Sequence, residues 1–178
     1  MAVFMLTDNN SVESVNELGF KEDREEGLEN LIINNPKIFP VEKISGNVQW
    51  IPISKQMRLL GGRLRTDTIG IDDEGSIYVI ENKLDSNDDK KRVSQQVRDY
   101  AHVLRTMKWD DFLIKIEQAN NSNEIREQKF SFSGKSLEET LNTTNDLQKI
   151  PWSSEKSKEC LESIRNNFEN GKFILVIS

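Results

Sequence analysis

A short apolar run that ends in three polar residues constrains the fold more than any other feature of the chain. Residues 77–80 read Ile-Tyr-Val-Ile, and Glu81, Asn82 and Lys83 follow directly. An unbroken run of β-branched and aromatic residues favours a strand that is buried on both faces. Ionisable groups at the end of such a strand are costly unless a partner compensates their charge. The run therefore predicts a central strand with a functional site at its end.

The segment before this strand predicts its hairpin partner. Residues 65–71 form the predicted partner strand, and the Asp-Asp-Glu-Gly sequence of residues 72–75 forms the turn. Asp67 and Glu81 are nearly symmetric about that turn, so cross-strand pairing would bring them together. Glu81 and Lys83 are two residues apart and project from one face of the strand. We expect the three side chains to gather at the open end of the hairpin.

These residue types suit the hydrolysis of a phosphodiester. Asp67, Glu81 and the backbone carbonyl of Asn82 would supply oxygen ligands to a divalent cation, Mg²⁺ or Mn²⁺. Such a cation polarises a phosphoryl oxygen and lowers the pKa of bound water. Lys83 would orient that water or neutralise charge that develops in the transition state. The sequence indicates no organic cofactor.

Hydrophobic periodicity predicts the remaining elements. In chain order they are a helix over 23–34, one strand or two over 41–53, a basic loop over 58–62, helices over 88–107 and 109–119, a short strand over 130–133, helices over 136–142 and 153–170, and a buried strand over 172–178. This order is typical of an α/β sandwich with a mixed central sheet flanked by helices. We divide the chain into an N-terminal extension, 1–22, and one domain, 23–178. Because the last strand runs to Ser178, we expect this domain to be truncated at its C-terminus.

Composition narrows the function classes. A single cysteine excludes an intrachain disulfide and a cysteine-based zinc cluster, and a single histidine leaves one candidate base for Ser-His or Cys-His catalysis. No apolar run is long enough to cross a membrane, so we expect a cytoplasmic protein without a membrane partner. The net charge of −6 disfavours a domain whose main role is to coat phosphates, although carboxylates that bind metal contribute to that charge.

The order of Asp67, a strand-turn-strand and then Glu81, Asn82 and Lys83 resembles the active-site hairpin of the PD-(D/E)XK nucleases. Thr66 stands where that family has a variable proline. The resemblance is to uncharacterised and DNA-repair-associated members of the family. It implies a restriction-endonuclease-like three-layer sandwich with a central mixed β-sheet flanked by helices.

Other segments share this resemblance, which covers roughly residues 25–178. Gln96 and Tyr100 resemble the Gln-x-x-x-Tyr segment on the helix after the catalytic strand, where the glutamine supports the active site. A glutamate of the first helix completes the metal shell in the family. Glu25 is the preferred match to it, with Glu26 as the alternative.

The resemblance implies a Mg²⁺- or Mn²⁺-dependent deoxyribonuclease, by expectation an endonuclease, that acts on DNA. Its implied catalytic residues are Asp67, Glu81, Lys83, Gln96 and Glu25. The basic residues expected to contact DNA phosphates are Arg58, Arg63, Arg65, Lys90, Lys91 and Arg92. A homodimer is also open, because many nucleases of this class pair to cut both strands. The alternative is a catalytically silent module of the same fold that binds nucleic acid or protein within a larger defence or repair protein.

Overall fold

The computed structural model describes residues 3–6, 12–15, 24–47, 49–82, 90–143 and 153–177. Its strands are β1 (Val3–Leu6), β2 (Val12–Val15), β3 (Trp50–Lys55), β4 (Arg58–Leu59), β5 (Leu64–Arg65), β6 (Thr68–Asp72), β7 (Ile77–Glu81) and β8 (Phe173–Ile177). Its α-helices are α1 (Arg24–Asn34), α2 (Val41–Ser45), α3 (Lys90–Thr106), α4 (Trp109–Asn120), α5 (Asn123–Gln128), α6 (Leu137–Thr143) and α8 (Ser154–Glu169). Its 3₁₀ helices are η1 (Pro36–Ile38) and η2 (Leu60–Gly62).

The central sheet has the strand order β3, β6, β7, β8. β3, β6 and β7 are antiparallel neighbours, whereas β8 runs parallel to β7. β6 and β7 form the predicted hairpin, in which Ile71 pairs with Ile77 and Thr68 pairs with Ile80. The apolar residues of β7 are fully buried, as their unbroken run predicts. The prediction of an α/β fold with a mixed central sheet is confirmed.

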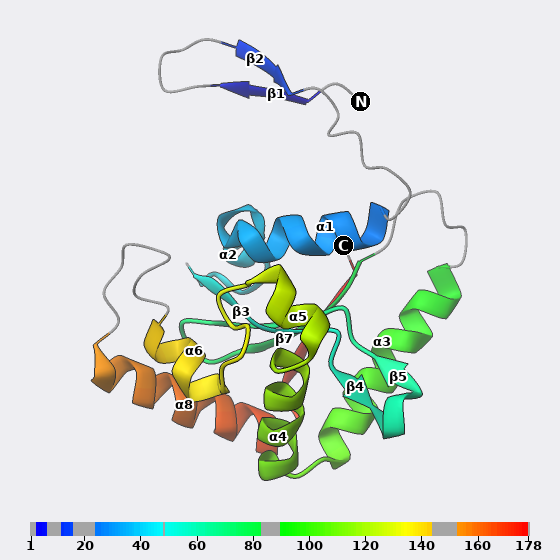
Figure 1. Ribbon diagram of the computed structural model, residues 1–178, viewed down its shortest axis with the longest axis vertical. Helices are drawn as coiled ribbons and strands as arrows, with labels where there is room; N and C mark the ends of the chain where they lie inside the picture. The colour runs from blue at the N-terminus through cyan, green and yellow to red at the C-terminus, as the bar shows by residue number, and fades with distance from the viewer. Residues whose placement is uncertain are drawn as a thin grey trace.

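Helices cover both faces of this sheet (Figure 1). One face packs against α3, α4, α6 and α8 through a large apolar cluster that includes Ile69 and Val79. The other face packs against the α1 and α2 region through a smaller cluster that includes Trp50, Tyr78 and Ile80. Successive residues of β7 therefore alternate between the two layers, as the pleat of a strand requires. The three layers are compatible with the expected sandwich.

Close packing on the α1 side requires a glycine in β6. A Cβ atom at Gly70 would lie 2.3 Å from Nε1 of Trp50. The Trp50 ring stacks on Phe39 with a centroid separation of 4.6 Å, and Tyr78 meets Phe39 edge-on at 5.8 Å. This aromatic cluster fixes the segment between α1 and α2 against the sheet.

The prediction that a strand or a pair of strands begins at residue 41 is wrong. Residues 41–45 form the short helix α2, and the strand begins only at Trp50. Val41 is the buried residue of α2, and Gly46 ends the helix in the left-handed conformation with a φ of 82°. That conformation favours glycine, so the expected strand turn is instead a helix C-terminus.

The prediction of a short strand over 130–133 is also wrong, because these residues form turns. Phe130 and Phe132 stack on each other at 5.4 Å and pack against Ile33 and Ile125. Their alternation with polar residues resembles a strand pattern, but tertiary packing holds them in turns. The structure also has the short helix α5, whose N-cap is Ser122 and which no sequence pattern predicted.

The long helices are confirmed as α1, α3, α4 and α8, and each end lies within two residues of its predicted bound. α6 begins with a capping box, because the Ser136 amide donates to Glu139 Oε2 at 2.8 Å and the Glu139 amide donates to Ser136 Oγ at 3.2 Å. The last strand, β8, has the predicted position but is only half-buried, with Leu175 and Ile177 exposed. It is less buried than predicted because it lies at the edge of the sheet.

The N-terminal extension contains an antiparallel pair of strands, β1 and β2. Among the helices that the structure describes, none has the length and apolar character needed to span a membrane.

Candidate active site

The hairpin of β6 and β7 brings Asp67 and Glu81 to the same end of the sheet. Thr68 pairs with Ile80, so continuing the register by one residue places Asp67 across from Glu81. Asp67 lies in a bend just before β6 rather than within a strand. Its Oδ2 atom accepts a hydrogen bond of 2.7 Å from the Asn82 amide. The predicted cross-strand approach of these residues is thus present in the structure.

Tyr100 of α3 holds the buried carboxylate of Glu81. Its hydroxyl group lies 3.0 Å from Glu81 Oε2 and also reaches the backbone carbonyl oxygen of Arg65. Since a tyrosine hydroxyl has one proton to donate, the two oxygens share it. Gln96 donates from Nε2 to the Tyr100 oxygen, so the glutamine acts on Glu81 through the tyrosine. Burial and the negative charges of Glu81 and Asp67 raise the pKa of Tyr100, which keeps this donor protonated.

A third carboxyl group, that of Glu29 in α1, lies within electrostatic range of Asp67. Glu29 is 3% exposed. Burial, and next the negative charge of Asp67, raise the pKa of Glu29 from 4.5 to about 8. The attraction of Lys55 acts in the opposite direction but is outweighed. The negative charge of Asp67 therefore adds to burial in disfavouring the ionised form of Glu29.

Lys55 is a fully buried lysine beside Glu29. Its Nζ atom donates to Asn30 Oδ1 at 2.8 Å and to Gln128 Oε1 at 3.1 Å. The same nitrogen lies 3.4 Å from a carboxylate oxygen of Glu26 and 3.4 Å from one of Glu29. Two amide oxygens and two glutamates thus share three N–H donors, which fixes the position of Glu29.

Gln56 links Glu29 to the segment that carries Asp67. The Gln56 amide donates to the Asp67 carbonyl at 2.8 Å, and its Nε2 atom donates to Glu29 Oε2 at 3.4 Å. Gln56 adopts a φ of 55°, an uncommon conformation for a residue other than glycine. Strain of this kind often occurs at functional sites, because the surrounding structure must compensate for it.

Several predicted site residues lie outside what the structure describes. Lys83 is one of them, as are the side chains of Glu25, Lys90 and Lys91. Glu26, the alternative to Glu25, is partly exposed and contacts Lys55 rather than Asp67 or Glu81. The remaining basic residues predicted to contact DNA are exposed: Arg58, Arg63, Arg65 and Arg92.

The oxygen donors of Asp67, Glu81 and Asn82 are of the type that Mg²⁺ and Mn²⁺ prefer. Over the described ranges of the chain, no three His, Cys, Asp or Glu side chains are grouped closely enough to form a metal cage. A site with two carboxylates would complete its shell with a backbone oxygen and water, as Mg²⁺ commonly does. The negative charge of Asp67, which adds to burial in raising the pKa of Glu29, would also attract a cation.

The only cysteine is unsuited to nucleophilic catalysis. Cys160 is buried, and burial together with the charge of Asp72 raises the pKa of its thiol to about 12. A thiol with such a pKa is not ionised at neutral pH.

Sequence reasoning missed Glu29 and Lys55. Glu29 precedes Ile32 and Ile33 by three and four residues, so its place on the apolar side of α1 was visible in the helical spacing. Lys55 had no such signal. An irregularity between Pro52 and Ser54 shifts the register of β3, and that shift determines the side of the sheet on which Lys55 lies.

The chain matches no protein-family model, and neither the curated proteins nor the solved structures contain a match to it.

Proposed function

We propose that the chain is a Mg²⁺- or Mn²⁺-dependent endonuclease of the restriction-endonuclease-like fold that hydrolyses phosphodiester bonds in DNA. One observation carries this proposal. Asp67 and Glu81 lie at cross-strand positions at the end of the hairpin, where Asp67 accepts a hydrogen bond from the Asn82 amide and Glu81 is contacted by the Tyr100 hydroxyl. A folded core has no need for two acidic groups at this position, whereas a divalent cation requires them.

Asp67, Glu81 and the Asn82 carbonyl would hold the ion, with Glu29 as a nearby third carboxylate. When bound, a divalent cation polarises the phosphoryl oxygen and lowers the pKa of the attacking water. Tyr100 keeps Glu81 in one orientation, because it donates to that carboxylate from a fixed position in α3. Preorganised ligands of this kind avoid the reorganisation that would otherwise slow the reaction.

Lys83 and Gln96 have supporting roles in this proposal. Lys83 follows the carboxylate strand by two residues, and its ammonium group would stabilise the hydroxide or the charge on the phosphoryl oxygens. Gln96 positions Tyr100 and so acts on the metal ligands indirectly. Loss of Gln96 is therefore expected to slow cleavage less than loss of Asp67 or Glu81.

The test is cleavage of supercoiled plasmid DNA in Mg²⁺ and in Mn²⁺. Asp67→Asn and Glu81→Gln are expected to reduce cleavage by at least a hundredfold, as the loss of transition-state charge stabilisation commonly does. Asp111→Asn is the matched control, because Asp111 is an exposed acid of α4. Melting curves establish that each variant is folded. Wild-type cleavage by both folded active-site variants would refute the proposal.

A catalytically silent binding module is the second candidate. The observation in its favour is that the described residues contain no ready group of three metal-binding side chains. A Mn²⁺ titration followed by thermal denaturation separates the two functions, because a ligand that binds the folded state must stabilise it. The nuclease is expected to gain stability in millimolar Mn²⁺, and Glu81→Gln is expected to gain less. A silent module would show the same melting temperature with and without the ion.

A further inference from the structure

A basic pocket adjoins the candidate active site. It has a volume of about 400 Å³ and lies between the two-stranded ribbon of β4 and β5 and the helices α4 and α5. The ribbon contributes Arg58 and Arg65, and α4 contributes Lys115. A pocket of this size is within the range of about 300–1,000 Å³ that is usual for sites binding small molecules or groups.

The charges on the pocket wall are unbalanced. Arg58 and Arg65 are direct cross-strand partners in the ribbon. Like charges in such positions repel each other, so the pairing weakens the ribbon unless an anion lies between them. In the part of the chain that the structure describes, neither arginine has an acidic partner, and Glu124 is the only acid on the pocket wall. Lys115 donates to the neutral amide oxygen of Gln118.

The pocket and the active site share structural parts. Lys55 and Gln56, which contact Glu29, also line the pocket. The backbone carbonyl of Arg65 accepts the hydrogen bond from Tyr100, and the same hydroxyl contacts Glu81. The pocket thus borders the residues that contact Glu29 and Glu81, so a strand bound there would lie near the carboxylates.

We propose that this pocket binds a phosphodiester group of the nucleic-acid strand, next to the bond that is cut. Arg58 and Arg65 bind the phosphate from the ribbon, and Lys115 binds it from α4. The planar guanidinium group suits this role, because it donates two parallel hydrogen bonds to phosphate oxygens. Leu60 at the ribbon tip is 55% exposed and offers an apolar contact to the adjoining sugar or base. This inference rests on the proposed nuclease function.

The test is DNA binding without catalysis. A fluorescein-labelled DNA of about 20 nucleotides, single-stranded or duplex, is titrated with the full chain in chelator and low salt, and anisotropy is recorded. Arg58→Ala/Arg65→Ala is expected to raise the Kd at least tenfold and to lower the slope of log Kd against log salt by about two. Lys115→Ala is expected to change both in the same direction by less.

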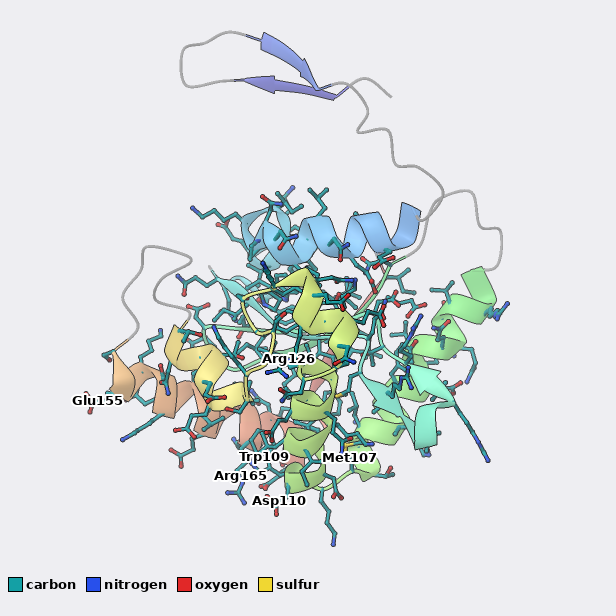
Figure 2. All side chains as sticks on the ribbon, viewed as in Figure 1. Met107, Trp109, Asp110, Arg126, Glu155 and Arg165 are labelled. Atoms are coloured by element: carbon teal, nitrogen blue, oxygen red, sulfur yellow. The ribbon has the colours of Figure 1, made fainter. Side chains whose placement is uncertain are left out.

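Arg165→Ala is the matched control. Arg165 lies on α8, away from the β4–β5 ribbon (Figure 2), and its ion pair with Glu169 is exposed. The control is expected to keep the wild-type Kd and slope, and the melting temperature of every variant is measured. An unchanged Kd in both folded pocket variants would overturn the inference, as would a wild-type chain that binds neither DNA.

Competition distinguishes a strand from a free anion. Millimolar inorganic phosphate could stabilise the wild type but not the double variant, while the two proteins bind DNA equally well. This result would mean that the pocket is a site for free phosphate, and the inference would be wrong. Plasmid cleavage by the same variants separates this inference from the nuclease proposal. If the wild type cleaves DNA and the double variant binds DNA as tightly as the wild type, the pocket inference alone is refuted. If the double variant binds DNA more weakly but the wild type does not cleave, the nuclease proposal alone is refuted.

Discussion

At the scale of single residues, Glu29 and Lys55 form an unusual buried pair of opposite charge. Both side chains are buried, and they lie 3.4 Å apart. Burial raises the pKa of Glu29 to about 8 despite this contact, so the carboxyl group is largely protonated at neutral pH in the absence of a bound cation. If a bound cation displaces this proton, metal affinity should increase with pH until the pH reaches about 8.

The raised pKa of Glu29 predicts a specific dependence of stability on pH. Between pH 4.5 and about 8 the folded state binds a proton that the unfolded state has released. The contribution of the Glu29 proton to stability is therefore complete below pH 4.5 and is lost as the pH rises to about 8. Across this range the free energy of unfolding of the wild type should fall, relative to that of Glu29→Gln, by a few kcal/mol, since one pKa unit corresponds to about 1.4 kcal/mol.

Urea denaturation at a series of pH values measures this difference. Glu29→Gln also loses the charge that faces Lys55, so the slope with pH, rather than the absolute stability, is the relevant quantity. Parallel curves for the two proteins would show that Glu29 titrates at its ordinary pKa.

At the scale of elements, the hairpin, the long helices, α6 and β8 were predictable, whereas α2, α5 and the turns at 130–133 were not. The run of residues 77–80 indicated the identity and burial of β7, because a short run of β-branched and aromatic residues next to turn residues favours a buried strand over a helix. The predictions for α2 and for the turns at 130–133 were wrong, because these segments have too few apolar residues to distinguish helical from strand spacing. The register irregularity in β3 falls at Pro52, a residue that suits an edge strand or a bulge, but the side to which it turns Lys55 shows only in the tertiary structure.

The contact of β6 with β3 yields a test of the aromatic cluster. Gly70→Ala places a methyl group where the Trp50 ring lies, and is expected to destabilise the fold by about 1–3 kcal/mol or more. The same substitution in a Trp50→Leu background should cost less, because the smaller side chain leaves room for the methyl group. Thermal denaturation of the four proteins measures the coupling. Equal losses in the two backgrounds would show that Trp50 is not the obstacle.

At the scale of the whole molecule, the three layers bring residues from distant parts of the chain to one end of the sheet. α1 supplies Glu29, the hairpin supplies Asp67 and Glu81, and α3 supplies Gln96 and Tyr100 (Figure 1). The hairpin pair was predictable from local spacing, whereas the Gln96–Tyr100 pair was expected only from the family resemblance. The contributions of Glu29 and of the pocket residue Lys115 depend on how α1 and α4 dock onto the sheet, which only the tertiary structure shows.

Crystal diffraction from protein soaked in Mn²⁺, with data collected at a wavelength where manganese scatters anomalously, tests the central claim most directly. We predict one strong anomalous peak about 2.0–2.4 Å from carboxylate oxygens of Asp67 and Glu81 and from the Asn82 carbonyl. The peak should be lost in Glu81→Gln crystals under the same soak. A peak at another position, or none at saturating Mn²⁺, would contradict a metal-dependent nuclease at this hairpin.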